Sequence, residues 1–141
     1  MKHGAPMPVK LVRQYTVFLP NIPGALAKFV ELFANAGINI IGLASEIRDD
    51  SGVVRVAVDA DKKVSHILTG AGFTTIETTM ISLNLEDKPG QLMRLTRVLG
   101  DNNINITTVY GTSDTSHTGR LLMNVSDSDK AMEVLKAELA K

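Results

Sequence analysis

The sequence contains no cysteine, and aromatic residues make up only 4% of its 141 residues. Without cysteine, the chain has no disulfide, thiolate metal site, iron–sulfur cluster or cysteine nucleophile. The scarcity of aromatic side chains argues against a sheet surface that stacks RNA bases. Lysine and arginine, 15 together, are balanced by 15 acidic residues, so no basic excess is available for a nucleic-acid backbone. We therefore expect no nucleic-acid partner.

The sequence also lacks a long hydrophobic run. No stretch of about 18 consecutive apolar residues occurs, so we expect no membrane-spanning helix and no membrane partner. The first ten residues include Pro6 and Pro8 and no apolar segment of signal-peptide length, which makes the cytoplasm the default location. Hydrophobic residues nevertheless form 44% of the chain, enough for the core of a folded globular protein.

Residues that commonly carry catalysis or bind metals are not grouped in the sequence. His66 and His117 have no partner at metal-ligand spacing, and Gly70–Gly72 stands without a phosphate-binding motif. A small enzyme that hydrolyses acyl phosphates would need an arginine beside a phosphate-cradling loop, but no basic residue lies between Pro20 and Leu26. We therefore predict no enzymatic activity, no catalytic residue, no metal site and no cofactor.

The chain resembles itself when it is compared with itself at an offset of 66 residues. Two short motifs recur, one with Pro-Gly and leucine and one reading Ile-Asn-Ile, and apolar positions between them match as well. This pattern predicts a tandem duplication with one unit over residues 10–74 and a second over residues 75–141. The motifs lie at Pro23–Leu26 and Ile38–Ile40 in the first copy and at Pro89–Leu92 and Ile104–Ile106 in the second.

Each unit has the same predicted order of elements. A strand over Tyr15–Leu19 precedes a helix with one apolar face, and Gly37 suits the end of that helix. Alternating valines over Val54–Val58 predict a later strand. The order is an α+β fold of two ferredoxin-like βαββαβ units, with antiparallel sheets and helices on one face. The second unit has no evident fourth strand of its own, and Val9–Arg13 is a candidate for that position.

A repeated loop joins the first strand of each unit to its helix. It places Gly24 or Gly90 in the first helical turn, where backbone N–H groups lack helical partners and carry partial positive charge. A small carboxylate suits this position, although the glycines also fit a purely conformational role. Asn21 and Asp87 lie in the same loops, either as helix N-caps or as partners of a ligand's ammonium group.

Asn39 and Asn105 begin the second strand of each unit. The connection through a helix places them at the opposite end of the sheet from the loop. Within one unit they therefore share no pocket with the loop, whereas across a pairing of units they can. The alternative role for both residues is a local hydrogen bond where the strand begins.

Together these motifs resemble the ACT domain, an amino-acid-binding regulatory module, over Tyr15–Lys141. A free-standing pair resembles the small stand-alone ACT proteins. The resemblance implies allosteric binding of a free amino acid at an interface between units, where the loop of one meets the second-strand start of another. The residues it implies are Asn21, Ile22, Gly24, Ala25, Asn39, Ile40, Asp87, Lys88, Gly90, Gln91, Asn105 and Ile106.

Exposed strand edges at residues 38–47 and 104–110 need covering, which favours a homodimer. The alternative is a ligand-independent protein-interaction or dimerisation module that acts on a metabolic enzyme. A pocket lined only by apolar side chains would favour this alternative.

Overall fold

The computed structural model describes residues 9–59, 64–86, 88–113 and 118–141. The chain divides into two compact units. One unit is Val12–Thr79, here called the N-terminal unit. The other, the C-terminal unit, is Met80–Lys141 together with the N-terminal residues up to Leu11. None of the helices in these described ranges is long and apolar enough to cross a lipid bilayer.

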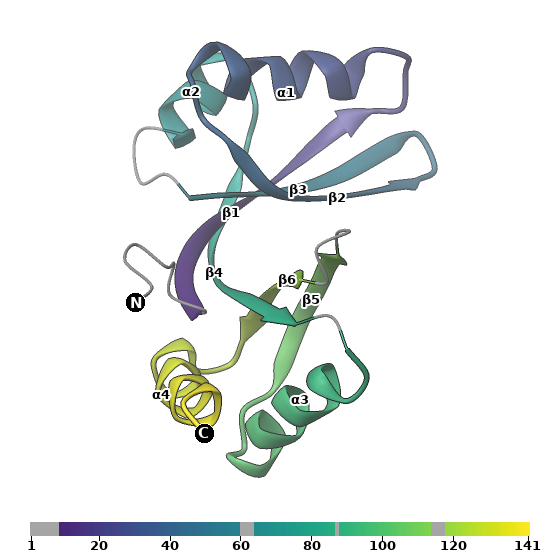
Figure 1. Ribbon diagram of the computed structural model, residues 1–141. Coiled ribbons are helices and arrows are strands. Elements are labelled where there is room, and N and C mark those ends of the chain that lie inside the picture. The colour runs from purple at the N-terminus through teal and green to yellow at the C-terminus, as the bar shows by residue number, and fades with distance from the viewer. Residues whose placement is uncertain (1–8, 60–63, 87, 114–117) are drawn as a thin grey trace. The chain divides into compact units, whose positions relative to one another are not determined.

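The N-terminal unit has the predicted order of strands and helices, with two helices packed on one face of a sheet (Figure 1). The strands lie in the order β2, β3, β1 and the first part of β4, and β3 is antiparallel to both of its neighbours. The predicted α+β class is confirmed. Its elements are β1 (Val9–Pro20), α1 (Ala25–Asn35), β2 (Ile40–Arg48), β3 (Ser51–Val58), α2 (Val64–Gly70) and β4 (Ile76–Glu86).

The core of the N-terminal unit follows from alternation along the strands and helical periodicity. The predicted alternation of Val54, Val56 and Val58 is confirmed, because all three side chains are buried in one apolar cluster with Phe29. The ring of Phe29 packs edge-on against that of Phe33, with centroids 5.3 Å apart. Burial of these large apolar side chains provides most of the driving force for folding.

Both long helices that follow a first strand end in the same way. Gly37, with φ of 69°, adopts the left-handed conformation, and its N–H donates to the Ala34 carbonyl oxygen at 3.1 Å. The predicted role of Gly37 at the helix end is confirmed. Asn103, with φ of 59°, has the same role in the C-terminal unit. Each turn directs the chain into the next strand.

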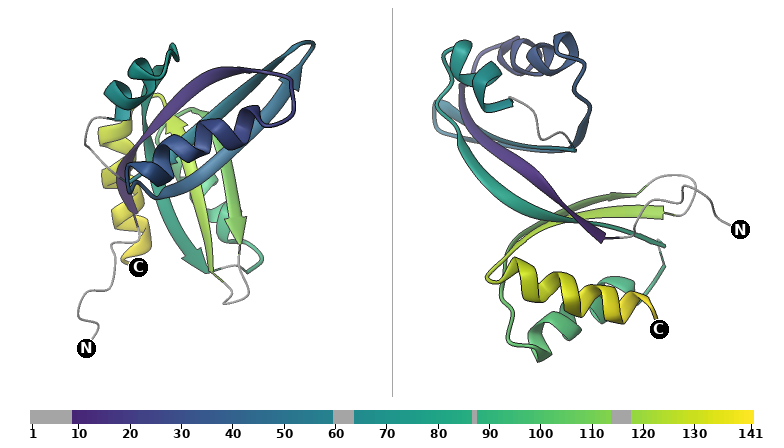
Figure 2. Two further views of the ribbon diagram at one scale, coloured as in Figure 1. Left: turned by 90° about the horizontal axis from the view of Figure 1, so that it is seen from above. Right: turned by 90° about the vertical axis from the view of Figure 1, so that its left-hand side faces the viewer.

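The C-terminal unit repeats this architecture, and its two helices lie on one face of its strands (Figure 2). Strand β6 lies between β4 and β5 and is antiparallel to both. Lys130 Nζ donates to the carbonyl oxygen of Asn102 at 2.7 Å and thereby joins the two helices. The remaining elements are α3 (Gln91–Asp101), β5 (Ile106–Ser113), β6 (Thr118–Val125) and α4 (Ser128–Leu139).

The C-terminal unit takes its fourth strand from the beginning of the chain. Strand β1 neighbours β4, and the first described residues of β1 belong to this unit. Val9 is only 1% exposed and lies in one apolar cluster with Ile81, Leu83 and Met123. Strand β4 contributes to both units, because Ile76–Thr79 belongs to the N-terminal unit and the residues from Met80 belong to the C-terminal unit.

Candidate functional site

Both strand-to-helix loops place a glycine at the N-cap of the following helix. Gly24 has φ of 86° and Gly90 has φ of 91°, and neither cap has a side-chain hydrogen bond. Glycine adopts this left-handed conformation without the steric penalty of a side chain. The interpretation of Asn21 as an N-cap is wrong, because Gly24, three residues later, is the N-cap. The N–H of Asn21 donates to the Asp50 carbonyl oxygen at 3.1 Å. Asp87 lies outside the described residues.

A pocket with a volume of about 390 Å³ lies beside the loop of the C-terminal unit. It is bounded by the end of β4, the first turn of α3, the end of β5 and the beginning of β6. This volume is within the range found for small-molecule sites in proteins. The lining residues are Leu85, Glu86, Lys88, Gln91, Leu92, Gly111, Thr112, Gly119, Arg120 and Leu121.

Strand register brings these segments together from distant parts of the sequence. Leu85 at the end of β4 pairs with Gly119 at the beginning of β6. On the other side of β6, Gly111 pairs with Leu121. Because β4 and β5 are both antiparallel to β6, they run in the same direction and both end beside the loop. The pocket is therefore built within one unit by sheet pairing.

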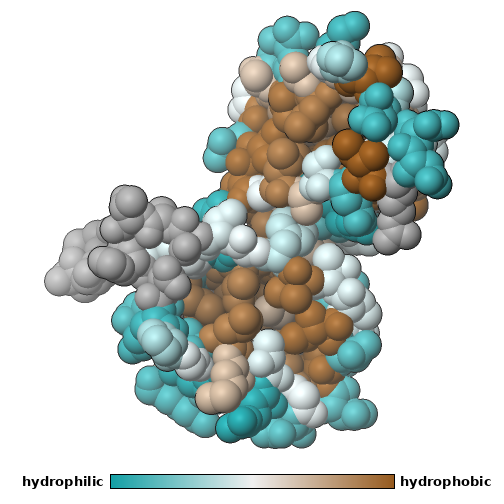
Figure 3. Space-filling model, turned by 90° about the vertical axis from the view of Figure 1, so that its right-hand side faces the viewer, coloured by the Kyte–Doolittle hydropathy of each residue, from teal (hydrophilic) through white to brown (hydrophobic). Residues whose placement is uncertain are grey.

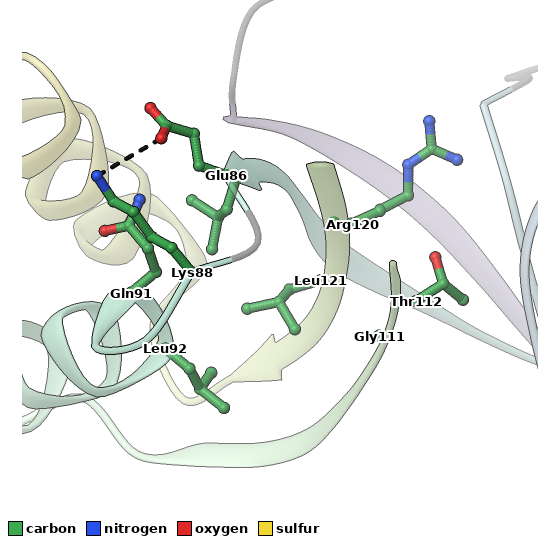
Figure 4. Close-up of a pocket in the computed structure, with 10 residues that line it drawn as sticks. Glu86, Lys88, Gln91, Leu92, Gly111, Thr112, Arg120 and Leu121 are labelled. Carbon is green, nitrogen blue, oxygen red and sulfur yellow. Dashed lines mark ion pairs between the residues drawn. The ribbon is translucent and has the colours of Figure 1, made fainter. Parts of the chain in front are cut away.

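The polar and apolar side chains of the pocket are separated. In Figure 4, Lys88, Gln91, Leu92 and Leu121 surround the open space, whereas the side chain of Arg120 points away from it. The direction of Arg120 follows from register, because it pairs with Asn84 and its Nε lies 3.5 Å from Asn84 Oδ1. Of the two lining cations, Lys88 is the one that belongs to the loop, and its Nζ lies 3.5 Å from the Glu86 carboxylate.

The pocket therefore combines an ion pair at its rim with apolar walls. The side chains of Lys88 and Glu86 are both exposed, so water weakens their attraction and either group can change partner. Leu85, Leu92 and Leu121 provide the apolar surface. Such a site suits a small molecule that has charged groups at one end and carbon atoms at the other.

Two of the residues predicted for the C-terminal site, Lys88 and Gln91, line the pocket, and Gly90 precedes Gln91 as the helix N-cap. Asn105 lies elsewhere, because its N–H donates to Ser126 Oγ at 3.0 Å and its carbonyl oxygen accepts from the Ser126 N–H at 2.9 Å. Ile106 follows it and pairs with Val125. The expectation that the second-strand start and the loop lie at opposite ends of one unit is confirmed.

The N-terminal unit carries its predicted site residues at the same places in the fold. Asn21, Ile22, Gly24 and Ala25 form the loop and the start of α1. Asn39 and Ile40 lie at the far end of the sheet, where Ile40 pairs with Val58. Ile22 and Ala25 occupy the positions of Lys88 and Gln91, so this loop is apolar where the other is polar.

Sequence reasoning missed the contribution of the end of β5 and the beginning of β6. These segments follow the loop by more than twenty residues and reach it only through the sheet. One signal was available, since a glycine inside a strand often marks a close approach of another group. Gly111 is such a residue. The lining residues that were not predicted are Leu85, Glu86, Leu92, Gly111, Thr112, Gly119, Arg120 and Leu121.

The described part of the chain contains no group of three or more histidine, aspartate or glutamate residues that could hold a metal ion.

Comparison with known proteins identifies relatives of the whole chain. A family model described as an ACT domain pair matches residues 10–140. Protein BT0572 from Bacteroides thetaiotaomicron has a similar structure, with a TM-score of 0.82, 24% identity, and coverage of 94% of this chain and 91% of that one. No curated protein matches the sequence at a significant level.

Two aspartate kinase structures are also similar. The regulatory subunit of aspartate kinase from Thermus thermophilus, in its ligand-free form, gives a TM-score of 0.67 at 15% identity, with 94% of this chain and 95% of that one covered. E. coli aspartokinase III in complex with aspartate and ADP gives a TM-score of 0.62 at 17% identity, with 94% of this chain and 33% of that one covered. At these levels of sequence identity, the similarity shows a shared fold and no more.

Proposed function

This chain belongs to the ACT domain pair family, and from that membership we propose that it is a regulatory module that binds a free amino acid. The observation that carries the proposal is the pocket of about 390 Å³ whose rim contains Lys88 and Gln91. A pocket with this polar rim favours a small charged ligand over an apolar protein segment. Aspartate kinase offers a precedent, because a ligand-free regulatory subunit of that enzyme shares this fold.

The chemistry of the rim explains how an amino acid would be held. The ligand carboxylate would accept hydrogen bonds from Lys88 Nζ and from backbone N–H groups in the first turn of α3, which carry partial positive charge. Hydrogen bonds between ionised groups are stronger than neutral ones. Gln91 offers both a donor and an acceptor to the ligand's polar groups.

We further propose that a second copy of the chain completes the site. Among the strands of the described ranges, β2 and β5 have one neighbour each, so their outer edges are available for pairing. In a homodimer, Asn105 and Ile106 of one copy would approach Gly90 and the Asp87 position of the other. The N-terminal units would pair in the same manner, with Asn39 and Ile40 against the loop that contains Asn21, Ile22, Gly24 and Ala25.

Such a site links ligand binding to assembly. A ligand that contacts both copies binds the assembled form more tightly than the separated form, and it therefore shifts the population toward assembly. The regulated partner would be a metabolic enzyme whose interaction depends on the assembled surface.

The test is thermal unfolding with each of the twenty amino acids at millimolar concentration. A ligand at 100 times its dissociation constant adds about 2.7 kcal/mol to stability, which raises the unfolding midpoint by several degrees. We expect a shift for one amino acid or a few related ones, and a smaller shift in Lys88→Met. Lys28→Met, an exposed lysine of the N-terminal unit, is the control. A flat response to all twenty would overturn the proposal.

A ligand-independent protein-interaction module is the second candidate, favoured by exposed apolar side chains on the N-terminal unit. Figure 3 shows apolar surface on each unit, and an unusually large patch often marks a protein interface. The exposed large apolar residues of this unit's loop, first helical turn and edge strand are Ile22, Leu26, Leu43 and Ile47. With a flat amino-acid response, capture of one dominant metabolic enzyme by the wild type but not by Ile47→Asp would support this candidate.

A further inference from the structure

We propose that the pocket of the C-terminal unit selects amino acids with an uncharged aliphatic side chain and that the N-terminal unit lacks an equivalent site. The inference rests on the proposed function, because it names the ligand class for the same pocket.

The ion pair at the rim is complementary to the two ends of a zwitterion. Lys88 Nζ and the Glu86 carboxylate lie 3.5 Å apart, and both side chains are exposed. Exchanging this weak contact for two contacts with the ligand costs little, since exposed ion pairs contribute little to stability. Lys88 would take the ligand carboxylate and Glu86 its ammonium group, leaving the ligand side chain directed toward the strands.

Among the described residues, the walls offer no charged partner to that side chain. Leu85, Leu92 and Leu121 supply hydrocarbon, and the remaining lining cation, Arg120, is turned toward Asn84. A charged ligand side chain would lose its hydration without gaining an ion pair, which is costly. An aliphatic side chain gains free energy in the same place, because each of its CH₂ groups is removed from water.

Gly111 and Leu121 determine how much room the side chain has. A Cβ placed on Gly111 would lie 2.6 Å from Leu121 Cδ2, so the leucine side chain occupies space that any larger residue at position 111 would need. A side chain at position 111 would force Leu121, which lines the pocket, to move. The missing side chain therefore preserves the volume in which the ligand's aliphatic part would lie.

The N-terminal unit keeps part of the apolar wall, because Leu26 lies at the position of Leu92, but it lacks the charged pair and the glycine. Pro20 and Ile22 replace Glu86 and Lys88, so the charged pair is missing. Ser45 lies opposite Val54 where Gly111 lies opposite Leu121. The duplicated unit thus keeps the fold but not the groups that would recognise a zwitterion, and we infer one ligand per chain.

Isothermal titration calorimetry on the full chain tests the inference. The ligands are leucine, isoleucine, valine and methionine, compared with aspartate, glutamate, lysine, arginine and serine. We expect the aliphatic group to bind at least about tenfold more tightly, which corresponds to 1.4 kcal/mol. The expected stoichiometry is one ligand per chain.

A matched pair of variants locates the site. Leu92 is 52% exposed and Leu26, its counterpart in the N-terminal unit, is 39% exposed, so substitution of either should leave the fold intact. Leu92→Gln should weaken binding of the preferred amino acid by about tenfold, because part of the apolar wall is lost. Leu26→Gln should bind like the wild type. Circular dichroism establishes that both variants are folded.

The outcomes separate this inference from the proposed function. If no amino acid binds, both are overturned. If a charged or polar amino acid binds more tightly than the aliphatic group, the function stands and the selectivity is overturned. Two ligands per chain, or an equal loss of affinity in Leu26→Gln, would overturn the assignment to the C-terminal unit alone.

Discussion

Leu121 packs into the space beside Gly111. A Cβ added to Gly111 would lie 2.6 Å from Leu121 Cδ2 and 2.9 Å from the carbonyl oxygen of Arg120, distances that no ordinary contact allows. The two residues are direct partners on β5 and β6. In the N-terminal unit the partners at this register are Ser45 and Val54. Serine is larger than the glycine at position 111, and valine is smaller than the leucine at position 121.

Gly111→Ala should therefore lower the free energy of unfolding by about 1–3 kcal/mol, the usual effect of overpacking. Urea unfolding followed by circular dichroism measures the change. Gly100→Ala is the matched control, because a Cβ at this helical position meets nothing within 4 Å. Alanine there should be neutral or stabilising by up to about 1 kcal/mol.

The pair Gly111→Ser and Leu121→Val would introduce the combination found in the N-terminal unit. The double variant should be more stable than the sum of the two single effects predicts, because the shorter valine relieves the contact with the new side chain. A double-mutant cycle measures this coupling. Strict additivity would show that Leu121 is not the residue that requires glycine at position 111.

Val9→Ala should destabilise the C-terminal unit, although residue 9 lies far in the sequence from the rest of that unit. Val9 is 1% exposed, and loss of two buried carbon atoms with the cavity left behind should cost about 2 kcal/mol. Leu11→Ala is the control on the same strand, since Leu11 is 45% exposed and should change stability much less. Hydrogen exchange on β4 and β6 should become faster in Val9→Ala alone. Equal effects would contradict the packing of Val9 in this core.

Asp127 is the only described helix N-cap with a side-chain hydrogen bond, because its Oδ1 accepts from the Lys130 N–H at 3.0 Å. Asp127→Ala should cost about 1 kcal/mol in stability. Asp127→Asn keeps an acceptor at this position and should recover most of the loss. If both variants were equally destabilised, the charge of Asp127 rather than its capping bond would be responsible.

Stability should fall at high pH through Tyr15. Burial raises the pKa of Tyr15 above its ordinary value of 10.0, the Glu77 carboxylate raises it further, and Arg13 partly opposes this effect. The unfolded chain therefore loses the phenolic proton first. The stabilising contribution is complete below about pH 10 and is lost as the pH rises through the folded pKa. Urea midpoints measured below and above pH 10 should show a smaller decline in Tyr15→Phe than in the wild type.

The order of elements and most of the core could be predicted because they depend on neighbours in the chain. The alternation of Val54–Val58 and the position of Gly37 follow from side-chain direction and backbone conformation, which act over a few residues. The same pattern occurs in both units, so the order of elements in one unit predicts the order in the other. One local prediction was wrong. Asn21 resembles an N-cap by type, but the left-handed glycine that follows begins the helix three residues later.

The sequence by itself determined the tandem βαββαβ order and the polar loop residues Lys88 and Gln91. Only the tertiary structure decided which residues stand opposite them. Gly111 and Leu121 come to the loop through the pairing of β5 with β6, and Val9 reaches the core of the C-terminal unit through β1. Short-range periodicity specifies which face of an element is apolar. Strand register and the choice of neighbouring strand depend on contacts between distant segments, and these form only when the whole unit packs.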